Sequence, residues 1–213
     1  LVARRVGLSE LTDEFVRKEV EPLAVQIDRE ERTPEELVAK AAELGLFGLY
    51  TSPEYGGSGA DLISVCLVVE ELAKASPSFA GMLTVQMVLC PRTVEILGTP
   101  EQKQRILPKN SSGERLMAYS QSEPAGAANV AHHLTKVVPD GNGYRIDGSK
   151  LFCTQGTAGT WLVMAKSHDR QGRTPEGLRQ IKRDPPTTDT AQGQVLAIRR
   201  RAEDLPAMMI EVT

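Results

Sequence analysis

A change in the spacing of apolar residues close to residue 113 constrains the fold of this chain more than any other feature. Before this point apolar side chains recur every three or four residues, which is the pattern of one helix face. After it, short runs rich in β-branched residues alternate with turn residues, which is the pattern of strands. Helices followed by strands are typical of an α+β protein. We therefore predict an all-helical N-terminal domain, residues 1–112, and a β-domain, residues 113–213.

Local start and stop signals divide the first half into five predicted helices. These helices are expected at Leu8–Ile27, Pro34–Leu44, Leu62–Ala75, Ser78–Leu97 and Thr99–Pro108. Thr33 with Glu36, and Thr99 with Gln102, have the spacing of capping boxes, in which two side chains satisfy backbone N–H groups reciprocally. Gly45 follows an apolar stripe and predicts a left-handed helix end.

Strands separated by turn dipeptides are predicted in the second half. They are expected at Leu116–Gln121, Leu134–Val138, Gly143–Asp147, Lys150–Thr154, Thr160–Lys166 and Leu205–Val212. Residues 173–204 interrupt this pattern with few apolar side chains and with Pro185-Pro186. We interpret this stretch as a polar insertion. Its Arg199-Arg200-Arg201 run is weighed as an anion-binding patch, but a solvated loop is the simpler reading.

The composition excludes several classes of function. Hydrophobic residues make up 40% and charged residues 25% of the chain, as in a soluble globular protein. The formal net charge of −3 gives no reason to expect nucleic acid or an anionic membrane as partner. Uninterrupted apolar runs are far shorter than the ~20 residues of a membrane span, so no span is expected. The 3 cysteines lack paired spacing, which favours a reducing compartment and no disulfide or zinc site.

Short motifs of other chemistries are absent or incomplete. Gly56-Gly57-Ser58-Gly59 lacks the Gly-Lys-Ser/Thr ending of a phosphate loop and predicts a flexible turn. The adjacent His132 and His133 point to opposite sides of an extended chain, so we expect no metal site. No serine lies in a nucleophile-elbow pattern, and no cysteine has a recognisable histidine partner.

Two segments together offer the groups that a flavin ring needs. A flavin has polar edges, which suit hydroxyl and backbone N–H groups, and a flat face, which suits an aromatic wall. The segment from Tyr119 to Pro124 carries hydroxyls at the end of a predicted strand. In the segment from Lys150 to Gly156, strand alternation would put Phe152 and Thr154 on one face. Each signal alone is weak, because Ser and Thr are common in ordinary strands.

Longer motifs connect these segments to a known family. They are Ala42-Glu43-Leu44-Gly45-Leu46-Phe47-Gly48-Leu49, Pro53-Glu54-Tyr55-Gly56-Gly57-Ser58-Gly59, Gly98-Thr99-Pro100-Glu101-Gln102-Lys103 and Ser112-Gly113-Glu114. On these motifs the chain resembles the acyl-CoA dehydrogenases from about Leu11 to Asp169. The resemblance implies a helical N-terminal domain followed by a β-barrel-like middle domain. We expect the family's C-terminal four-helix domain, which carries its catalytic Glu, to be absent from this chain.

The resemblance also implies an FAD site. The residues expected at the cofactor are Tyr119, Gln121, Ser122, Phe152 and Thr154. Ser122 replaces the usual Thr and keeps its hydroxyl, Phe152 would stack where the family often has Trp, and Thr154 would bond near flavin N5. The family's substrate-binding Ser corresponds to Ala128, which cannot donate a hydrogen bond. No residue is assigned as catalytic and none as a metal ligand.

The implied activity is α,β-desaturation of an acyl thioester by a truncated or incomplete flavin-dependent acyl-CoA dehydrogenase. The implied partners are acyl-CoA or another acyl thioester and electron-transfer flavoprotein or another electron acceptor. A homo-oligomer in the cytoplasm, or in the mitochondrial matrix of a eukaryote, is expected. Two alternatives stay open: a flavin oxidase or monooxygenase on the same fold, hinted at by the altered stretch Ala125 to Asn129, and a non-catalytic remnant.

Overall fold

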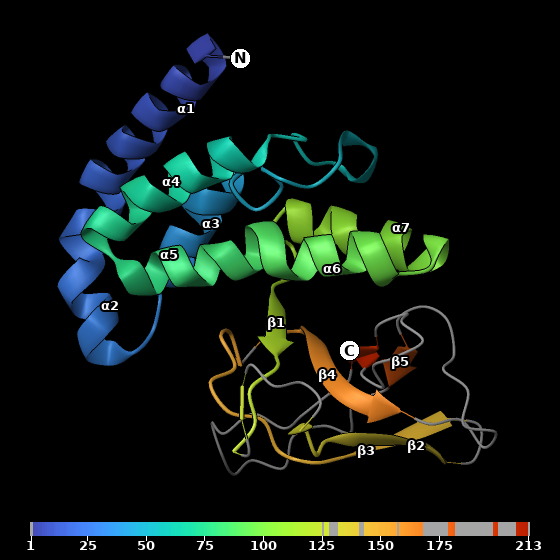
Figure 1. Cartoon of the computed structure of the whole chain (residues 1–213). Coiled ribbons are helices and arrows are strands. Elements are labelled where there is room, and N and C mark those ends of the chain that lie inside the picture. The colour runs from blue at the N-terminus through green and yellow to red at the C-terminus, as the bar shows by residue number, and fades with distance from the viewer. Residues whose placement is uncertain are drawn as a thin grey trace. The chain divides into compact units, whose positions relative to one another are not determined.

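The order of elements confirms the α+β class, with helices followed by a sheet (Figure 1). The computed structural model describes residues 2–124, 126–127, 132–140, 143–156, 158–167, 179–181, 198–199 and 208–212. These residues belong to two compact units. The helical unit contains residues 1–92 and 104–114, and the sheet unit contains residues 93–103 and 115–213. We keep the division into domains 1–112 and 113–213 as a proposal.

All five predicted helices are present. The helical elements are α1 (Val2–Phe15), η1 (Val16–Val20), η2 (Glu21–Leu23), α2 (Ala24–Glu30), α3 (Glu35–Glu43), η3 (Pro53–Tyr55), α4 (Leu62–Ala75), α5 (Pro77–Thr84), η4 (Val85–Leu89), α6 (Cys90–Leu97) and α7 (Pro100–Ser111). The first predicted helix is divided by the π-helical turn η1 and the 3₁₀ turn η2. Pro22 lies in η2 and has no N–H, so regular α-helical bonding cannot continue through it.

The two predicted capping boxes have different outcomes. At the start of α7 the prediction is confirmed, because Thr99 N donates to Gln102 Oε1 at 2.9 Å and Gln102 N donates to Thr99 Oγ1 at 3.3 Å. At the start of α3 the prediction is wrong, because Pro34 occupies the N-cap position and no side chain caps the helix. Pro34 has ψ 137, so the helix begins one residue later and Thr33 lies too far from the first turn.

The ends of α3 and α7 lie close to Gly45 and Gly113, and α7 does not end at Pro108. Gly45 has φ 73, which confirms the left-handed end predicted after α3. The prediction that the last helix stops near Pro108 is wrong, since α7 continues to Ser111 with Pro108 inside it. The chain turns at Gly113, which has φ 75 and donates its N–H to Asn110 O at 3.0 Å. Pro108 has no N–H to donate, but its carbonyl still accepts from Ser112 N at 3.0 Å.

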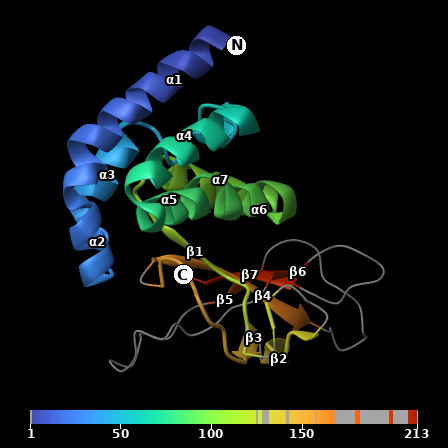
Figure 2. The same ribbon diagram turned by 60° about the vertical axis from the view of Figure 1, so that its left-hand side comes forward.

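An apolar core holds the helical unit together. α1 lies beside α4 (Figure 2), and the rings of Phe15 and Phe79 lie with centroids 6.4 Å apart. The predicted glycine turn before α4 is confirmed, and it depends on a close backbone approach. A Cβ atom added at Gly57 would lie 2.0 Å from Thr51 O, a collision with backbone that no side-chain movement relieves. Only glycine fits this position.

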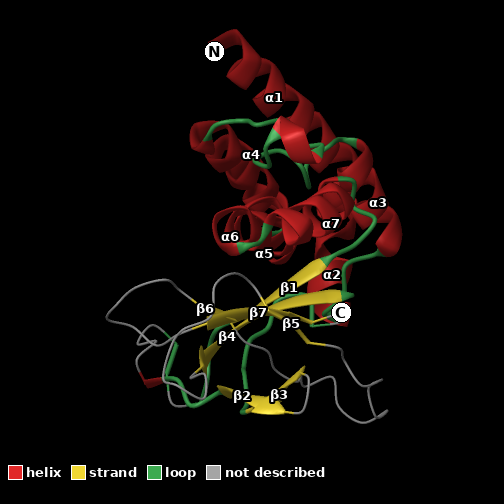
Figure 3. Cartoon of the chain, turned by 90° about the vertical axis from the view of Figure 1, so that its right-hand side faces the viewer, coloured by secondary structure: helices red, strands yellow, loops and turns green. Residues whose placement is uncertain are grey.

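A seven-stranded mixed sheet forms the second unit (Figure 3). Its strands are β1 (Met117–Ser120), β2 (Lys136–Asp140), β3 (Gly143–Asp147), β4 (Thr160–Ser167), β5 (Arg179–Ile181), β6 (Ile198–Arg199) and β7 (Met208–Val212). β4 is central: β1 and β2 pair with it in parallel and β7 pairs with it in antiparallel. A core of alanine and valine side chains packs around Trp161, whose Nε1 donates to Ala158 O at 2.9 Å.

Two short strands, β5 and β6, lie within residues 173–204, the stretch interpreted as a polar insertion. β5 pairs with β7 in parallel, and β6 pairs with β7 in antiparallel. Both strands therefore contribute to the sheet. The remaining residues of this stretch, with the Arg200-Arg201 part of the basic run, lie outside the described residues.

The stretch Pro77–Leu97, which contains α5, η4 and α6, has the length and composition of a membrane-crossing helix. The prediction from uninterrupted apolar runs did not identify it. Half of the most apolar part of this stretch is buried within the structure, and Phe79, Leu83 and Met87 are fully buried. A core helix of a globular protein has the same properties, so this is weak evidence for a span.

The contrast between the two caps gives a prediction about stability. Thr99→Ala should lower the free energy of unfolding by about 1 kcal/mol, because the backbone N–H of Gln102 loses the Thr99 hydroxyl as its acceptor. Thr33→Ala should change it by less than about 0.5 kcal/mol, because α3 has no side-chain cap. Urea denaturation followed by circular dichroism measures both. Equal losses in the two variants would contradict the assignment of the cap.

Candidate cofactor site

The two segments expected to line a flavin lie side by side in the sheet unit. Tyr119 of β1 forms an isolated antiparallel bridge with Thr154. Leu151 N donates to Ser122 O at 2.9 Å, three residues further along the first segment. The segment after β1 and the segment that precedes β4 are therefore joined by backbone contacts, although about 30 residues of sequence separate them.

The prediction of a strand at Lys150–Thr154 is wrong. Phe152 has φ 56 and Gln155 has φ 60, and these left-handed conformations interrupt an extended chain. The side chains still divide between two environments. Ser120 Oγ lies 3.0 Å from Cys153 Sγ, which is packed against the sheet core, whereas Phe152 and Thr154 are exposed. The twist of the chain, and not strand alternation, turns Phe152 outward.

Phe152 is the most unusual side chain of this region, because 91% of it is exposed. An exposed aromatic ring on a backbone with positive φ is unfavourable on its own, since a non-glycine residue in this conformation is strained. Such strain is concentrated at ligand sites. Leu151, in the same segment as Phe152, is 41% exposed, and Leu134 is 64% exposed.

The remaining predicted residues have ordinary surroundings. Tyr119 and Ser122 are half-buried, and Gln121 Nε2 donates to Ala127 O at 3.2 Å. These three residues and Thr154 therefore come from the two adjacent segments. Ala128, the residue predicted at the substrate, lies outside the described residues.

A buried ion pair lies directly behind these segments. Lys150 Nζ is 2.6 Å from Glu123 Oε1, and the two side chains are 0% and 2% exposed. Lys150 Nζ also donates to Gln121 O at 2.9 Å. The Glu123 carboxylate accepts from the backbone N–H of Leu134, and from that of Thr135 at 3.1 Å.

The surroundings of the pair shift its pKa values. Burial alone would raise the pKa of Glu123, but the Lys150 ammonium and the two backbone N–H groups outweigh burial and lower the pKa to about 2. Burial lowers the pKa of Lys150, and the Glu123 carboxylate opposes this change. Glu123 is therefore ionised at neutral pH and bonded on both oxygens. A carboxylate held in this way is not available as a catalytic base.

His133 lies next to the pair and is 1% exposed. Its Nε2 is 3.3 Å from Ala127 O, so this nitrogen carries the proton that the carbonyl accepts. Burial and the Lys150 ammonium lower the pKa of His133, and the ring is neutral near pH 7. The adjacent His132 is exposed, so the two imidazoles have different environments.

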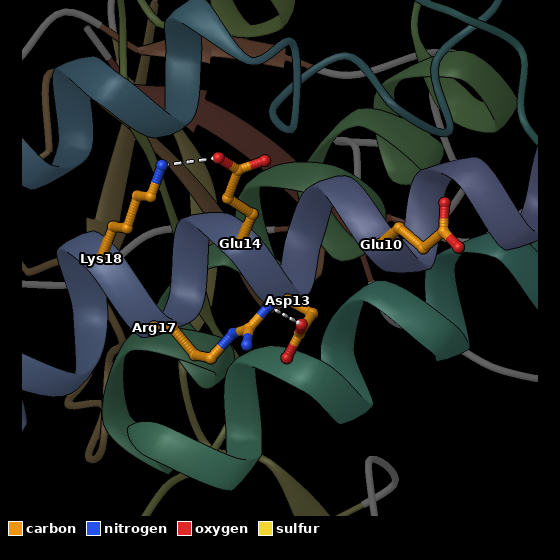
Figure 4. Close-up of a pocket in the computed structure, with 5 residues that line it drawn as sticks. All are labelled: Glu10, Asp13, Glu14, Arg17 and Lys18. Carbon is orange, nitrogen blue, oxygen red and sulfur yellow. Dashed lines mark hydrogen bonds and ion pairs between the residues drawn. The ribbon is translucent and has the colours of Figure 1, made fainter.

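A surface depression elsewhere has a different character. Glu10, Asp13, Glu14, Arg17 and Lys18 line it on α1 and η1 (Figure 4). Arg17 pairs with Asp13 and Lys18 with Glu14, both at 2.6 Å and one helix turn apart. These pairs are exposed, and exposed pairs at this spacing stabilise a helix weakly. We interpret the depression as a solvated helix face.

The sheet unit brings together several of the groups that the sequence predicts at a flavin. Phe152 offers an exposed aromatic face, and the hydroxyl of Thr154 and the amide of Gln121 lie on the adjoining backbone. The ion pair behind them is already satisfied and has no need of a ligand.

Comparison with known proteins gives the same class. Residues 6–114 match the family model described as acyl-CoA dehydrogenase, N-terminal domain. The short-chain specific acyl-CoA dehydrogenase of Clostridium acetobutylicum is 37% identical over 164 residues, which are 76% of this chain and 43% of that protein. This chain thus spans less than half the length of that relative.

Solved structures agree. A glutaryl-CoA dehydrogenase of Mycobacterium smegmatis, in complex with FADH2, superposes with a TM-score of 0.73 at 25% identity over 77% of this chain and 42% of that chain. A structure from work on the electron transferring flavoprotein of Acidaminococcus fermentans superposes with a TM-score of 0.73 at 31% identity over 79% of this chain and 44% of that chain.

The helical unit followed by a mixed sheet is the fold of the flavin-linked acyl-CoA dehydrogenases. The family model covers more than half of the residues, and the sequence resemblance is confirmed. The chain belongs to the acyl-CoA dehydrogenase family.

Sequence reasoning missed the contribution of Lys150. It treated Lys150 only as the first residue of a predicted strand, and it assigned no catalytic role to Glu123. No local signal predicts the burial of Lys150, because the apolar pair Leu151-Phe152 that follows it is itself exposed. The partner could not be chosen from sequence, because 27 positions separate the two residues.

The pair gives a prediction with a defined pH dependence. Glu123→Gln should lower the free energy of unfolding at pH 7 by about 3 to 5 kcal/mol, because it leaves a buried ammonium without its counter-charge. Glu123 has a lower pKa in the folded state than its ordinary value of 4.5, so its stabilisation is present above that value and is lost as the pH falls toward 2. The difference between the variant and the wild type should therefore shrink from pH 5 to pH 2.

Glu114→Gln is the matched control. Glu114 pairs with Lys109 at 2.8 Å, but its side chain is 62% exposed, and the expected loss is below about 1 kcal/mol at every pH. Urea denaturation at a series of pH values measures both variants. A constant difference for Glu123→Gln across the acid range would disprove the ionised pair.

Proposed function

We propose that this chain supplies part of the cofactor site of a flavin-dependent acyl-CoA dehydrogenase that introduces an α,β double bond into an acyl thioester. One observation carries the proposal. The segments of Tyr119 and Thr154 are joined by backbone contacts and present the exposed Phe152 ring beside hydroxyl and amide groups. Family membership supports the same assignment.

FAD is the proposed cofactor, held by Tyr119, Gln121, Ser122, Phe152 and Thr154. When bound, FAD supplies the acceptor for the hydride that leaves the β-carbon of the thioester. Phe152 covers one face of the flavin ring and excludes water from it. The hydroxyls of Ser122 and Thr154 would donate to the polar edge of the flavin. The backbone of residues 121–122 fixes the orientation of that edge.

No residue is proposed as the catalytic base. The reaction needs a carboxylate to remove the α-proton, and Glu123 is bonded on both oxygens within the fold. The base is therefore assigned to a group other than Glu123. Glu123 is expected to keep its charge throughout the reaction.

The proposed partners follow from the activity. An acyl-CoA or another acyl thioester is the substrate, and its acyl carrier passes Ala128. Electron-transfer flavoprotein or another acceptor removes the electrons. We also propose a homo-oligomer, located in the cytoplasm, or in the mitochondrial matrix if the source is a eukaryote.

The sequence Ala125-Gly126-Ala127-Ala128-Asn129 favours a second candidate, a flavin oxidase or monooxygenase on the same fold. This stretch has Ala128 at the position where the resemblance implies the family's substrate-binding Ser. Rapid reaction of the reduced enzyme with oxygen would favour this candidate, and slow reaction with oxygen would favour the dehydrogenase.

Phe152→Ala tests the proposed site. It should weaken FAD binding about tenfold to hundredfold, because stacking of an aromatic side chain on a planar base contributes about 1 to 3 kcal/mol. Its thermal stability without FAD should be unchanged, since the ring is 91% exposed and Ala keeps the Cβ atom at the same positive φ. Titration with FAD, followed by quenching of flavin fluorescence, measures the affinity in the intact protein.

Leu62→Ala is the control, because Leu62 is 55% exposed on the helical unit and has no place in the proposed site. It should leave FAD affinity unchanged. If Phe152→Ala binds FAD as tightly as the wild type, the proposed site is wrong. If the wild-type protein itself binds no FAD, the proposed function is wrong.

The altered stretch gives a prediction about substrate. Ala128→Ser combined with Asn129→Asp should tighten binding of a medium-chain acyl-CoA by up to about tenfold, because the new hydroxyl restores one hydrogen bond of about 1 kcal/mol. Calorimetric titration of the FAD-loaded protein measures this change. An unaltered or weaker dissociation constant would mean that the substrate does not pass Ala128.

A further inference from the structure

The Lys150–Glu123 pair takes no part in the proposed chemistry, yet its hydrogen bonds go to the residues that surround the proposed cofactor. Lys150 Nζ donates to the carbonyl of Gln121, a proposed cofactor residue. Glu123 directly follows Ser122, and Lys150 directly precedes Leu151, whose N–H donates to Ser122 O. The pair therefore links the segment of Gln121 and Ser122 to the segment of Leu151 and Phe152.

A third segment is joined to the same pair. Glu123 accepts from the N–H groups of Leu134 and Thr135, and Thr135 O in turn accepts from Lys166 N of β4 at 2.8 Å. Gly148 permits this packing, because a Cβ there would lie 2.5 Å from Thr135 Oγ1. The pair is thus connected through Thr135 to the central strand of the sheet.

Burying two charges is unfavourable, and apolar residues of similar volume often replace such a pair without loss of stability. Stability alone therefore does not account for the pair. Its geometry offers another explanation. Phe152 and Gln155 have strained backbones two and five residues after Lys150. Strained conformations persist only where the neighbouring structure fixes them.

We propose that Lys150 and Glu123 are positioning residues, which hold the strained Phe152 turn and the Gln121–Ser122 backbone in the arrangement that orients the flavin. This inference rests on the proposed function. It assigns to the pair an effect on the environment of the bound flavin that is separate from its effect on folding. Neither residue touches the substrate or performs a chemical step.

The test is the double variant Lys150→Met/Glu123→Gln in the intact protein. Met is close to Lys in length and apolar, and the single oxygen of Gln accepts from one of the N–H groups of Leu134 and Thr135. The other N–H group loses its acceptor, but no charge is left unpaired. The visible circular dichroism and the reduction potential of bound flavin should both change. FAD affinity should fall about tenfold to hundredfold, as is usual when an outer partner of a bound group is removed.

Lys109→Met is the matched control, because it removes an ion pair of 2.8 Å whose lysine is 44% exposed in the helical unit. It should leave the dichroism, the potential and the affinity at wild-type values. Equal changes in Lys109→Met would overturn the inference. So would a double variant that melts at a lower temperature while its flavin dichroism, potential and affinity stay at wild-type values, because the pair would then be only structural.

If the double variant does not fold, Glu123→Asp decides. It keeps both charges but withdraws the carboxylate by one methylene from the N–H groups that it bonds. A changed flavin dichroism supports positioning, and an unchanged one overturns it. The proposed function is tested first, by FAD binding to the wild-type protein and by its weakening in Phe152→Ala. Only when both results are as expected do the double-variant measurements test the inference, so the two failures are distinguishable.

Discussion

The opposite charges of Glu123 and Lys150 lie 2.6 Å apart in the interior of the sheet unit, and the candidate site is arranged around them. In a medium of low dielectric constant neither charge is tolerable alone, so the two side chains must stay together. Each is also bonded to backbone, Lys150 to Gln121 O and Glu123 to Thr135 N. Residues 121–123, 134–135 and 150–151 consequently cannot move independently of one another.

The helical unit is held together in a different way. Its interior is apolar, with Phe15 and Phe79 in contact, and its charges form exposed pairs such as Asp13 with Arg17. Exposed pairs of this kind contribute little to stability, and breaking one leaves no buried charge. The two units therefore differ in where their ion pairs lie. The helical unit uses charge for its surface, while the sheet unit uses a buried pair where three segments of backbone must meet.

A feature of the fold can be predicted from the sequence when residues close to it in the chain determine it. The Thr99–Gln102 cap, the glycine turn before α4 and the class of the two halves follow from neighbouring residues, and all were predicted correctly. Thr33 was assigned a cap that the extended Pro34 prevents, and Lys150–Thr154 was assigned a strand that the φ of Phe152 interrupts.

The candidate site was predictable in part. Its two segments were identified from residue types and from the family resemblance, but their contact and the Lys150–Glu123 pair are long-range. Nothing in either segment alone specifies that Leu151 bonds to Ser122 or that Lys150 reaches Glu123. A local conformation with positive φ at Phe152 is equally hidden, because aromatic residues rarely adopt it and the tertiary contacts impose it.

The combination of strain, burial and exposure also bears on the alternative of a non-catalytic remnant. Phe152 and Gln155 are strained, Lys150 and Glu123 are buried as ions, and the Phe152 ring is exposed to water. Each feature is unfavourable or neutral for folding, and substitution by ordinary residues would remove it. In a module that binds nothing, no benefit would oppose such substitutions. Their presence together in two adjoining segments supports the proposed cofactor site, in which a ligand would cover the ring and bond the edge that these segments hold in place.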